Sequence, residues 1–407
     1  MRVEPISCFR PVPERAGRFS APPYDVMDDE QARAYVAEHP DSFFAIDRPE
    51  TAFDPEHDPY APEVYQYAVK LLNDRVKDGT LVREERTCLY VYRLAQNGRS
   101  QTGIVAAVSV DDYLDGTVRR HEQVREEKVR DRIAHISTVT AQTGPVLIAY
   151  HDFPAISFLV SLVCTGEPLY DFVAEDGVRH TVWRISREVA VEAICETFNQ
   201  VPFGYIADGH HRAAAAVRMC EEARAAGDAG ARDAFLAILY PASEMQVLAY
   251  NRVVADTNGL SEQDLIDKLK EAHLMVGERT DEPVVPAEHG HMGMYAFGAW
   301  RDLTFVDVPQ ESSDPTALLD ASLLQARVLA PILGIDDPTS DKRIQFVSGA
   351  AGASELERLA GTDGVAFFMY PTSVDELMKV SDAGMLMPPK STWFAPKPRS
   401  GLFLRRV

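Results

Sequence analysis

The stretch that decides the fold of this chain is "YIADGHHRAAAAVRMCEEA", residues 205–223. A short apolar run ends at Asp208 and a glycine, and an alanine-rich run that strongly favours helix follows. The pattern predicts a strand, a tight turn and a helix. It places His210, His211 and Arg212 in the first turn of that helix, which makes this turn the first candidate site.

The position of this turn at the start of a helix favours the binding of an anion. The first backbone N–H groups of a helix have no intrahelical partner, and they lie at the positive end of the macrodipole. Arg212 adds a planar guanidinium group that suits phosphate or carboxylate. We therefore expect Gly209, His210, His211 and Arg212 to bind a small anion, most naturally phosphate.

Two other interpretations of the turn remain open at this stage. Adjacent side chains on a helix point about 100° apart, so one metal ion would take only one of the two histidines. A metal-dependent hydrolase that uses His210 or His211 is the first alternative, although we assign no metal site. In the second, Asp208 only caps the helix and the histidines hydrogen-bond to nearby loops.

A second candidate is the segment "RRHEQVREEKVRDR", residues 119–132, which carries six Lys and Arg residues against four Asp and Glu residues. His121 and Glu122 would supply general acid–base chemistry beside cations that neutralise a bound anion. The neighbouring cations are Arg119, Arg120 and Arg125. The alternative is a solvated helix held by ion pairs, but several like charges at i+4 spacing argue against a purely structural helix.

The third candidate is the tail, residues 383–407, which has five basic residues and no acidic one. "GMLMPPKS" aligns with a phosphate-binding P-loop, except that Pro389 stands in place of the second glycine. Proline has no N–H group and cannot adopt positive φ, so a P-loop is excluded. The tail either presents Lys390, Ser391 and Thr392 to the anion or only docks on the body of the protein.

Composition limits the classes of function that this chain can have. Its 407 residues, 46% hydrophobic and 25% charged, are typical of a folded protein with two domains or lobes. A net charge of −21 argues against nucleic acid or an acidic membrane as partner, and leaves a small anionic ligand or nucleotide. Five scattered cysteines and no long apolar run at the N-terminus predict a cytoplasmic location without a membrane span.

The order of the expected elements predicts a mixed α+β fold with two lobes. Asn97-Gly98 and Asp176-Gly177 lie between strand-like runs and mark two hairpins in the N-terminal half. After residue 255 helices and strands alternate more regularly. We expect an N-terminal lobe at 1–255 with all the motifs above except the tail, and a C-terminal α+β lobe at 256–407 whose basic tail returns to the site.

Taken together, the motifs identify a family resemblance. "APPYDV", "RRHEQVREEKVRDR", "GPV", "YIADGHHRAAAA" and "MPPKSTWFAPKPRSGL" occur in the order seen in the bacterial family called domain of unknown function 1015. This resemblance spans essentially the whole chain. More distantly, the strand–DGHHR–helix unit is similar to the ParB/sulfiredoxin-like fold, which includes small kinases that phosphorylate free L-serine.

The distant resemblance implies a function as well as a local fold. In those kinases the corresponding turn holds the phosphates of ATP or ADP, with Mg²⁺, and a carboxylate acts as base on the serine hydroxyl. It implies that residues 208–212 bind phosphate and that Glu122, or else Asp208, is the base. The alternative is a ParB-like regulatory protein that binds a nucleotide and has no kinase activity.

Overall fold

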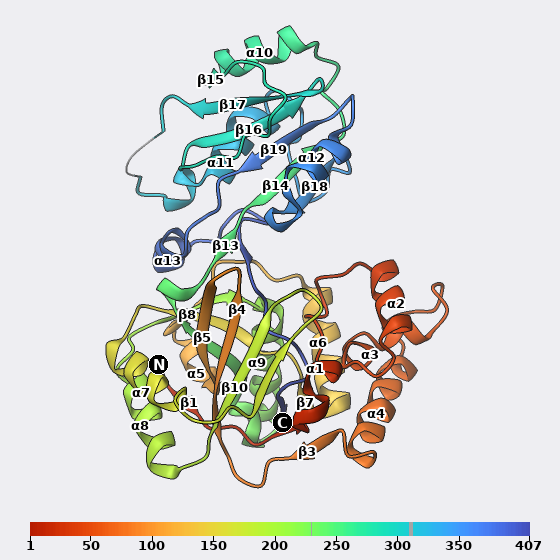
Figure 1. Cartoon of the computed structure of the whole chain (residues 1–407), viewed down its shortest axis with the longest axis vertical. Helices are drawn as coiled ribbons and strands as arrows, with labels where there is room; N and C mark the ends of the chain where they lie inside the picture. The colour runs from red at the N-terminus through yellow and green to blue at the C-terminus, as the bar shows by residue number, and fades with distance from the viewer. Residues whose placement is uncertain (229, 309–311) are drawn as a thin grey trace. The chain divides into compact units, whose positions relative to one another are not determined.

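The chain is a mixed α+β protein with two compact units, as the sequence predicts. The computed structural model describes residues 1–228, 230–308 and 312–407 (Figure 1). Unit 1 comprises Met1–Met245 and Pro396–Val407, and unit 2 comprises Gln246–Ala395.

The division between the units differs from the one expected near residue 255. Strand β14 (Tyr250–Val254) is an inner strand of the unit 2 sheet, where it pairs with β18 (Ile344–Ser348) and β19 (Val365–Met369). The last twelve residues of the chain fold into unit 1. In sequence, β14 resembles the strands before it, and only its pairing with the later strands β18 and β19 assigns it to unit 2. The sequence therefore places the boundary between the two units too late.

Unit 1 is built on a large mixed sheet. Within the described residues the strand order is β6-β11-β8-β12-β5-β4-β10-β9, and β1 pairs with β5 beside this path. Their bounds are β1 (Val3–Glu4), β4 (Leu89–Gln96), β5 (Arg99–Ser109), β6 (Val118–Arg119), β8 (Val146–Tyr150), β9 (Tyr170–Val173), β10 (Arg179–Ile185), β11 (Gly204–Asp208) and β12 (Ala234–Pro241). Two pairs, β11·β6 and β12·β8, are parallel.

Both predicted hairpins are confirmed. Strands β4 and β5 pair antiparallel through Gln96↔Arg99, and β9 and β10 pair through Val173↔Arg179. Asn97 and Gly98 both have positive φ, 51° and 75°, as a type I′ turn requires.

Helices cover the large sheet and a smaller sheet beside it. The small sheet has the order β3-β2-β21-β7, with β2 (Cys8–Pro11), β3 (Leu81–Arg83), β7 (Ala141–Gln142) and β21 (Leu404–Arg406). The helices are α1 (Pro13–Phe19), α2 (Asp29–Glu38), α3 (Phe44–Asp47), α4 (Pro62–Lys77), α5 (Val110–Leu114), α6 (Glu126–Val139), α7 (Pro154–Val163), α8 (Glu188–Phe198) and α9 (His210–Ala225), with short 3₁₀ turns η1 (Pro49–Ala52), η2 (Gly230–Asp233) and η3 (Ala242–Glu244). Residues of α7, α8 and α9 share one buried apolar cluster with the large sheet.

Unit 2 has its own sheet, covered on both faces. The strand order is β15-β17-β16-β19-β14-β18, and the further strands are β15 (Leu274–Val276), β16 (His291–Ala296) and β17 (Ala299–Phe305), with a separate pair β13 (Val247–Leu248) and β20 (Trp393–Phe394). Val254 belongs to the apolar cluster that includes α10 and α11, and Val253 belongs to the cluster that includes α12. Because side chains alternate along a strand, helices pack on both faces. They are α10 (Glu262–Glu271), α11 (Asp320–Leu324), α12 (Gly352–Ala360) and α13 (Val374–Asp382), with short turns η4 (Pro315–Leu318) and η6 (Gly349–Ala351).

The helix that begins at Asp320 changes its winding partway along. After α11 the chain forms a π-helical turn, η5 (Gln325–Leu329), in which the Ala330 N–H donates to the Gln325 carbonyl at 3.1 Å. Pro331 follows directly. A proline has no N–H and its ring clashes with the carbonyl four residues earlier, which explains the disturbed winding before it.

Among the described residues, no helix combines the length and the apolar character that crossing a membrane requires.

The close approach of β5 to β12 gives a test of the unit 1 sheet. A Cβ added at Gly103 would lie 2.7 Å from the Leu239 carbonyl oxygen, so Gly103→Ala must push two buried strands apart. We expect a loss of about 1–3 kcal/mol in the free energy of unfolding, measured by denaturant titration. Gly166→Ala is the control, because the nearest atom there is 3.4 Å away. Equal effects of the two substitutions would contradict this packing.

Candidate functional site

The turn between β11 and α9 has the predicted strand–turn–helix geometry. Strand β11 ends at Asp208, and Gly209 precedes α9 with φ of 94°, a left-handed conformation that favours glycine. A Cβ at Gly209 would also lie 3.0 Å from the Arg212 guanidinium carbon. Two features therefore favour glycine at position 209: the left-handed backbone conformation and the Arg212 side chain that folds back over this position.

Parallel pairing brings the second motif to this turn. Strand β6 runs parallel to β11, with Tyr205 opposite Arg119. The segments that follow two neighbouring parallel strands emerge at the same edge of a sheet, which is where ligands commonly bind in α/β proteins. The loop 120–125 therefore lies beside the first turn of α9. The motif 119–132 is not one helix, because α6 begins only at Glu126.

Glu122 and His210 form a hydrogen-bonded pair at this edge. His210 Nδ1 lies 3.3 Å from Glu122 Oε2, and the His121 backbone N–H donates to His210 Nε2 at 3.4 Å. The Glu122 carboxylate accepts a hydrogen bond from Nδ1–H and Nε2 accepts one from the backbone, so both ring nitrogens of His210 are engaged and the ring is fixed in orientation. The His210 side chain is only 3% exposed, whereas that of Glu122 is 50% exposed and open to a substrate.

Glu122 is ionised at neutral pH. Burial is the largest single effect and raises the pKa of Glu122, but the hydrogen bond from His210 together with the electrostatic effects of His210 and His211 outweighs it, so the pKa lies below its usual value. Glu122 is thus an oriented, half-exposed carboxylate that can accept a proton from a hydroxyl group held next to it.

The other two histidines of the cluster are also fixed in place. His211 Nε2 accepts the Arg125 backbone N–H at 3.1 Å, which ties α9 to the loop before α6. The His121 ring packs edge-on against the His210 ring with 4.5 Å between centroids. Burial lowers the pKa of both His121 and His211, so these imidazoles favour their neutral forms.

Asp208 is shared by two cations. Its Oδ1 lies 2.9 Å from Lys397 Nζ and its Oδ2 lies 2.7 Å from Arg212 Nη2. Arg212 also donates to the Pro145 carbonyl, and the Arg212 side chain is 9% exposed. Burial opposes the ionised form of Asp208, but the charges of Lys397 and Arg212 hold its pKa well below the usual range. Asp208 is therefore a poorer proton acceptor than Glu122.

The structure brings together only part of the predicted site. His121, Glu122 and Arg125 meet residues 208–212 at one edge of the sheet. The Arg119 guanidinium instead stacks on Phe203, 3.6 Å from the ring centroid. Arg120 lies near Tyr113, with 3.4 Å between its Nη1 and the tyrosine hydroxyl.

The predicted tail residues belong to unit 2, where they contact their own neighbours. The Lys390 ammonium lies 5.5 Å from the centre of the Tyr250 ring, and Ser391 donates to the Pro388 carbonyl at 2.7 Å. Thr392 is partly buried in the same unit.

Lys397 is the residue that sequence reasoning missed. It lies in the quoted stretch "MPPKSTWFAPKPRSGL", seven residues after Lys390 and within unit 1. The resemblance of residues 384–391 to a P-loop drew attention to Lys390 instead. The available signal was a second lysine held between prolines, "PKP".

No group of three or more His, Cys, Asp or Glu side chains placed to hold a metal ion occurs in the part of the chain that the structure describes.

Comparison with known proteins identifies the family. The model of the family described as "Protein of unknown function (DUF1015)" matches residues 3–322, which is most of the chain. The chain belongs to the DUF1015 family. No curated protein matches the sequence.

Solved structures resemble this DUF1015 protein only distantly. SbnI with a C-terminal truncation from Staphylococcus aureus has a TM-score of 0.37 and 12% identity, over 74% of this chain and 87% of that chain. A free serine kinase mutant in complex with AMP has a TM-score of 0.36 and 13% identity, over 74% of this chain and 91% of that chain. A conserved hypothetical protein from Pyrococcus furiosus has a TM-score of 0.33 and 13% identity, over 74% and 94%. Similarity at this level carries no argument about activity.

The shared carboxylate gives a pH-dependent prediction. Because the pKa of Asp208 is lowered in the folded state, its ionised form stabilises the fold above an unfolded-state pKa of about 3.9. This stabilisation is lost as the pH falls from the unfolded-state pKa of Asp208 through its lower folded-state pKa. Lys397→Met leaves Arg212 as the only partner, so we expect a loss of about 1–2 kcal/mol at pH 7, less than removal of a sole buried partner costs.

The free energy of unfolding is to be measured by urea titration from pH 7 down to about pH 1. The difference between wild type and Lys397→Met should narrow at the acid end of this range, where the pH falls through the lowered folded-state pKa of Asp208. Lys270→Met, on the exposed side of α10, is the control and should change little. A difference that stays constant with pH would show that Lys397 does not act through Asp208.

Proposed function

We propose that this protein is a small-molecule kinase, or a related phosphate-handling enzyme, that transfers a phosphoryl group from ATP or ADP to a hydroxyl group such as that of free L-serine. The observation that carries the proposal is the Glu122–His210 pair, fixed at the first turn of α9 with Glu122 half-exposed. It combines an ionised proton acceptor with a helix start that suits phosphate.

The local charge balance supports phosphate binding in a protein whose net charge is −21. Lys397 and Arg212 carry two positive charges against the single negative charge of Asp208. The N–H groups at the start of α9 add to this field. A phosphoryl group placed here would be stabilised mainly by fixed charges and positioning, which is how most of the catalysis in phosphoryl transfer arises.

Glu122 is the better candidate for the base. Asp208 is paired with two cations, whereas Glu122 pairs with the His210 imidazole and has half of its side chain exposed. In the proposed step the acceptor hydroxyl attacks the terminal phosphorus of the nucleotide. The bond from that phosphorus to the bridging oxygen breaks, and the hydroxyl proton passes to Glu122.

A nucleotide would bring Mg²⁺ with it. Mg²⁺ usually keeps several water ligands and binds through one or two carboxylates together with the phosphates of the substrate. Glu122 serves as the base in this proposal, so Mg²⁺ would be held mainly by the phosphates and by water, and a dedicated protein cage is not needed. Mg²⁺ would neutralise charge on the phosphates.

A regulatory protein that binds a nucleotide without transferring phosphate is the second candidate. The lowered pKa of Glu122 favours it, because a carboxylate that holds its proton weakly is a weaker base. Both candidates require a nucleotide on the α9 turn, and only the first requires proton transfer at Glu122.

The two candidates are separated by Glu122→Gln. A positioned base is typically worth ~10²–10⁴ in rate, so we expect phosphoryl transfer from labelled ATP or ADP to fall by about that factor. Nucleotide affinity, measured by equilibrium binding, should change by less than about threefold, because the amide keeps the shape of the carboxylate and removes no phosphate ligand.

Glu127→Gln is the matched control, since Glu127 lies nearby with its side chain 64% exposed and should leave turnover unchanged. Unchanged transfer in Glu122→Gln would exclude Glu122 as the base. Nucleotide binding by the wild type without transfer to any hydroxyl compound tested would favour the regulatory protein.

A further inference from the structure

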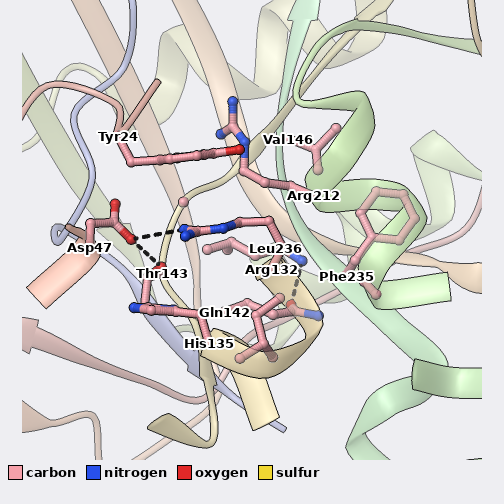
Figure 2. Close-up of a pocket in the computed structure, with 13 residues that line it drawn as sticks. Tyr24, Asp47, Arg132, His135, Gln142, Thr143, Val146, Arg212, Phe235 and Leu236 are labelled. Carbon is pink, nitrogen blue, oxygen red and sulfur yellow. Dashed lines mark hydrogen bonds and ion pairs between the residues drawn. The ribbon is translucent and has the colours of Figure 1, made fainter. Parts of the chain in front are cut away.

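The two cations that share Asp208 are held in place in different ways. Arg212 belongs to the first turn of α9, where its guanidinium group folds back over Gly209, and the side chain lines a small buried cavity (Figure 2). Lys397 instead comes from residues 396–399, which form neither helix nor strand. The backbone hydrogen bonds of a helix therefore fix Arg212, whereas Lys397 depends on the contacts that its neighbours in the chain make.

The segment that carries Lys397 is attached to unit 1 on both sides of this residue. Prolines before and after Lys397 restrict the backbone but form no hydrogen bond through nitrogen. The Pro396 carbonyl accepts a hydrogen bond from Gln101 Nε2, on β5, at 2.9 Å. The Ser400 N–H donates to the Ala21 carbonyl at 2.8 Å, and the Ala21 N–H donates back to the Ser400 carbonyl at 3.1 Å. The position of Lys397 thus depends on how firmly these attachments hold.

Arg399 is the side chain that ties this segment to several other elements of unit 1. Its Nη2 group donates to the Ser20 carbonyl, just after α1, at 2.8 Å and to Glu175 Oε1, between β9 and β10, at 3.0 Å. A longer bond of 3.4 Å reaches the Tyr35 hydroxyl on α2. The Arg399 backbone N–H donates to the Tyr92 hydroxyl on β4 at 3.3 Å. Because the Arg399 side chain is only 3% exposed, water competes little for these bonds.

The ion pair between Arg399 and Glu175 is charge-assisted at neutral pH. Burial is the largest effect and raises the pKa of Glu175, but hydrogen bonds and the charge of Arg399 outweigh it, so the pKa lies below its usual value. Charge-assisted hydrogen bonds are roughly twice as strong as neutral ones. Since Arg399 is two residues from Lys397, this pair holds the backbone from which the Lys397 ammonium group reaches Asp208 at 2.9 Å.

We propose that Arg399 is a positioning residue of the candidate site and acts through Lys397. By fixing the segment that carries Lys397, it keeps the ammonium group beside the α9 turn, where that group binds a phosphate oxygen of the nucleotide. Without Arg399, binding would have to offset the entropy lost when Lys397 is ordered. The inference rests on the proposed function in one respect, namely that the anion at this turn is a nucleotide phosphate.

Binding of ADP to single and double variants tests this role. Lys397→Met removes a charge-assisted hydrogen bond to phosphate, so we expect ADP affinity to fall by about 10- to 100-fold in equilibrium binding. Arg399→Met should lower the affinity at least about fivefold, because Lys397 is no longer held in place. In the Lys397→Met background the same change should cost less than about twofold, since no ammonium group is left to position.

A purely structural role of Arg399 predicts a different result. Arg399→Met would then weaken ADP binding equally in both backgrounds, or in neither, and either result would overturn the inference. Arg399→Lys should bind ADP more tightly than Arg399→Met, since an ammonium group has three donors for the acceptors that Nη2 contacts. Arg179→Met is the matched control and should leave ADP affinity unchanged, because Arg179 pairs with Asp171 within the hairpin that also carries Glu175.

Two further measurements keep the test decisive. If Arg399→Met does not fold, Glu175→Gln replaces it in both backgrounds, because it weakens the same ion pair from its half-exposed end. If the wild type binds no ADP, the proposed function fails, and the positioning role is measured by urea unfolding at pH 7 instead. Lys397→Met should then cost less stability in the Arg399→Met background than in the wild type, because Lys397 is no longer held at Asp208. Equal costs in the two backgrounds would contradict the positioning role.

Discussion

The candidate site depends on one buried interaction, the carboxylate of Asp208 shared between Lys397 and Arg212. It joins the β11–α9 turn to Lys397 in the segment after residue 396, which is 189 residues away from Asp208 in the sequence. Arg212 folds back over Gly209, so the guanidinium group lies at the start of α9 itself. Asp208, Arg212 and Lys397 together carry one net positive charge, and the ionised Glu122 lies on the other side of the same turn.

One acid–base element lies beside that network. On the edge of the sheet, His210 orients Glu122 towards solvent. Inside unit 1, Arg212 lines a small cavity together with Asp47 and His135. Arg212 thus contributes both to the α9 turn and to the wall of this cavity.

Local sequence patterns predicted the strand–turn–helix unit at residues 204–225 and the hairpins at Asn97-Gly98 and Asp176-Gly177, because neighbours in sequence determine turns and helix starts. Local patterns did not reveal the contacts that depend on pairing between segments far apart in the sequence. The proximity of Glu122 to His210 follows from β6 running parallel to β11. Lys397 contacts the α9 turn and Lys390 does not, because the chain returns to unit 1 only at Pro396.

A crystal structure of the protein with ADP and Mg²⁺ tests the central claim most directly. The account predicts that oxygens of the β-phosphate lie within hydrogen-bonding distance, ~2.7–3.2 Å, of backbone N–H groups in the first turn of α9, with Glu122 facing the phosphate. Phosphates bound away from this turn, for example beside Lys390 in unit 2, would contradict it.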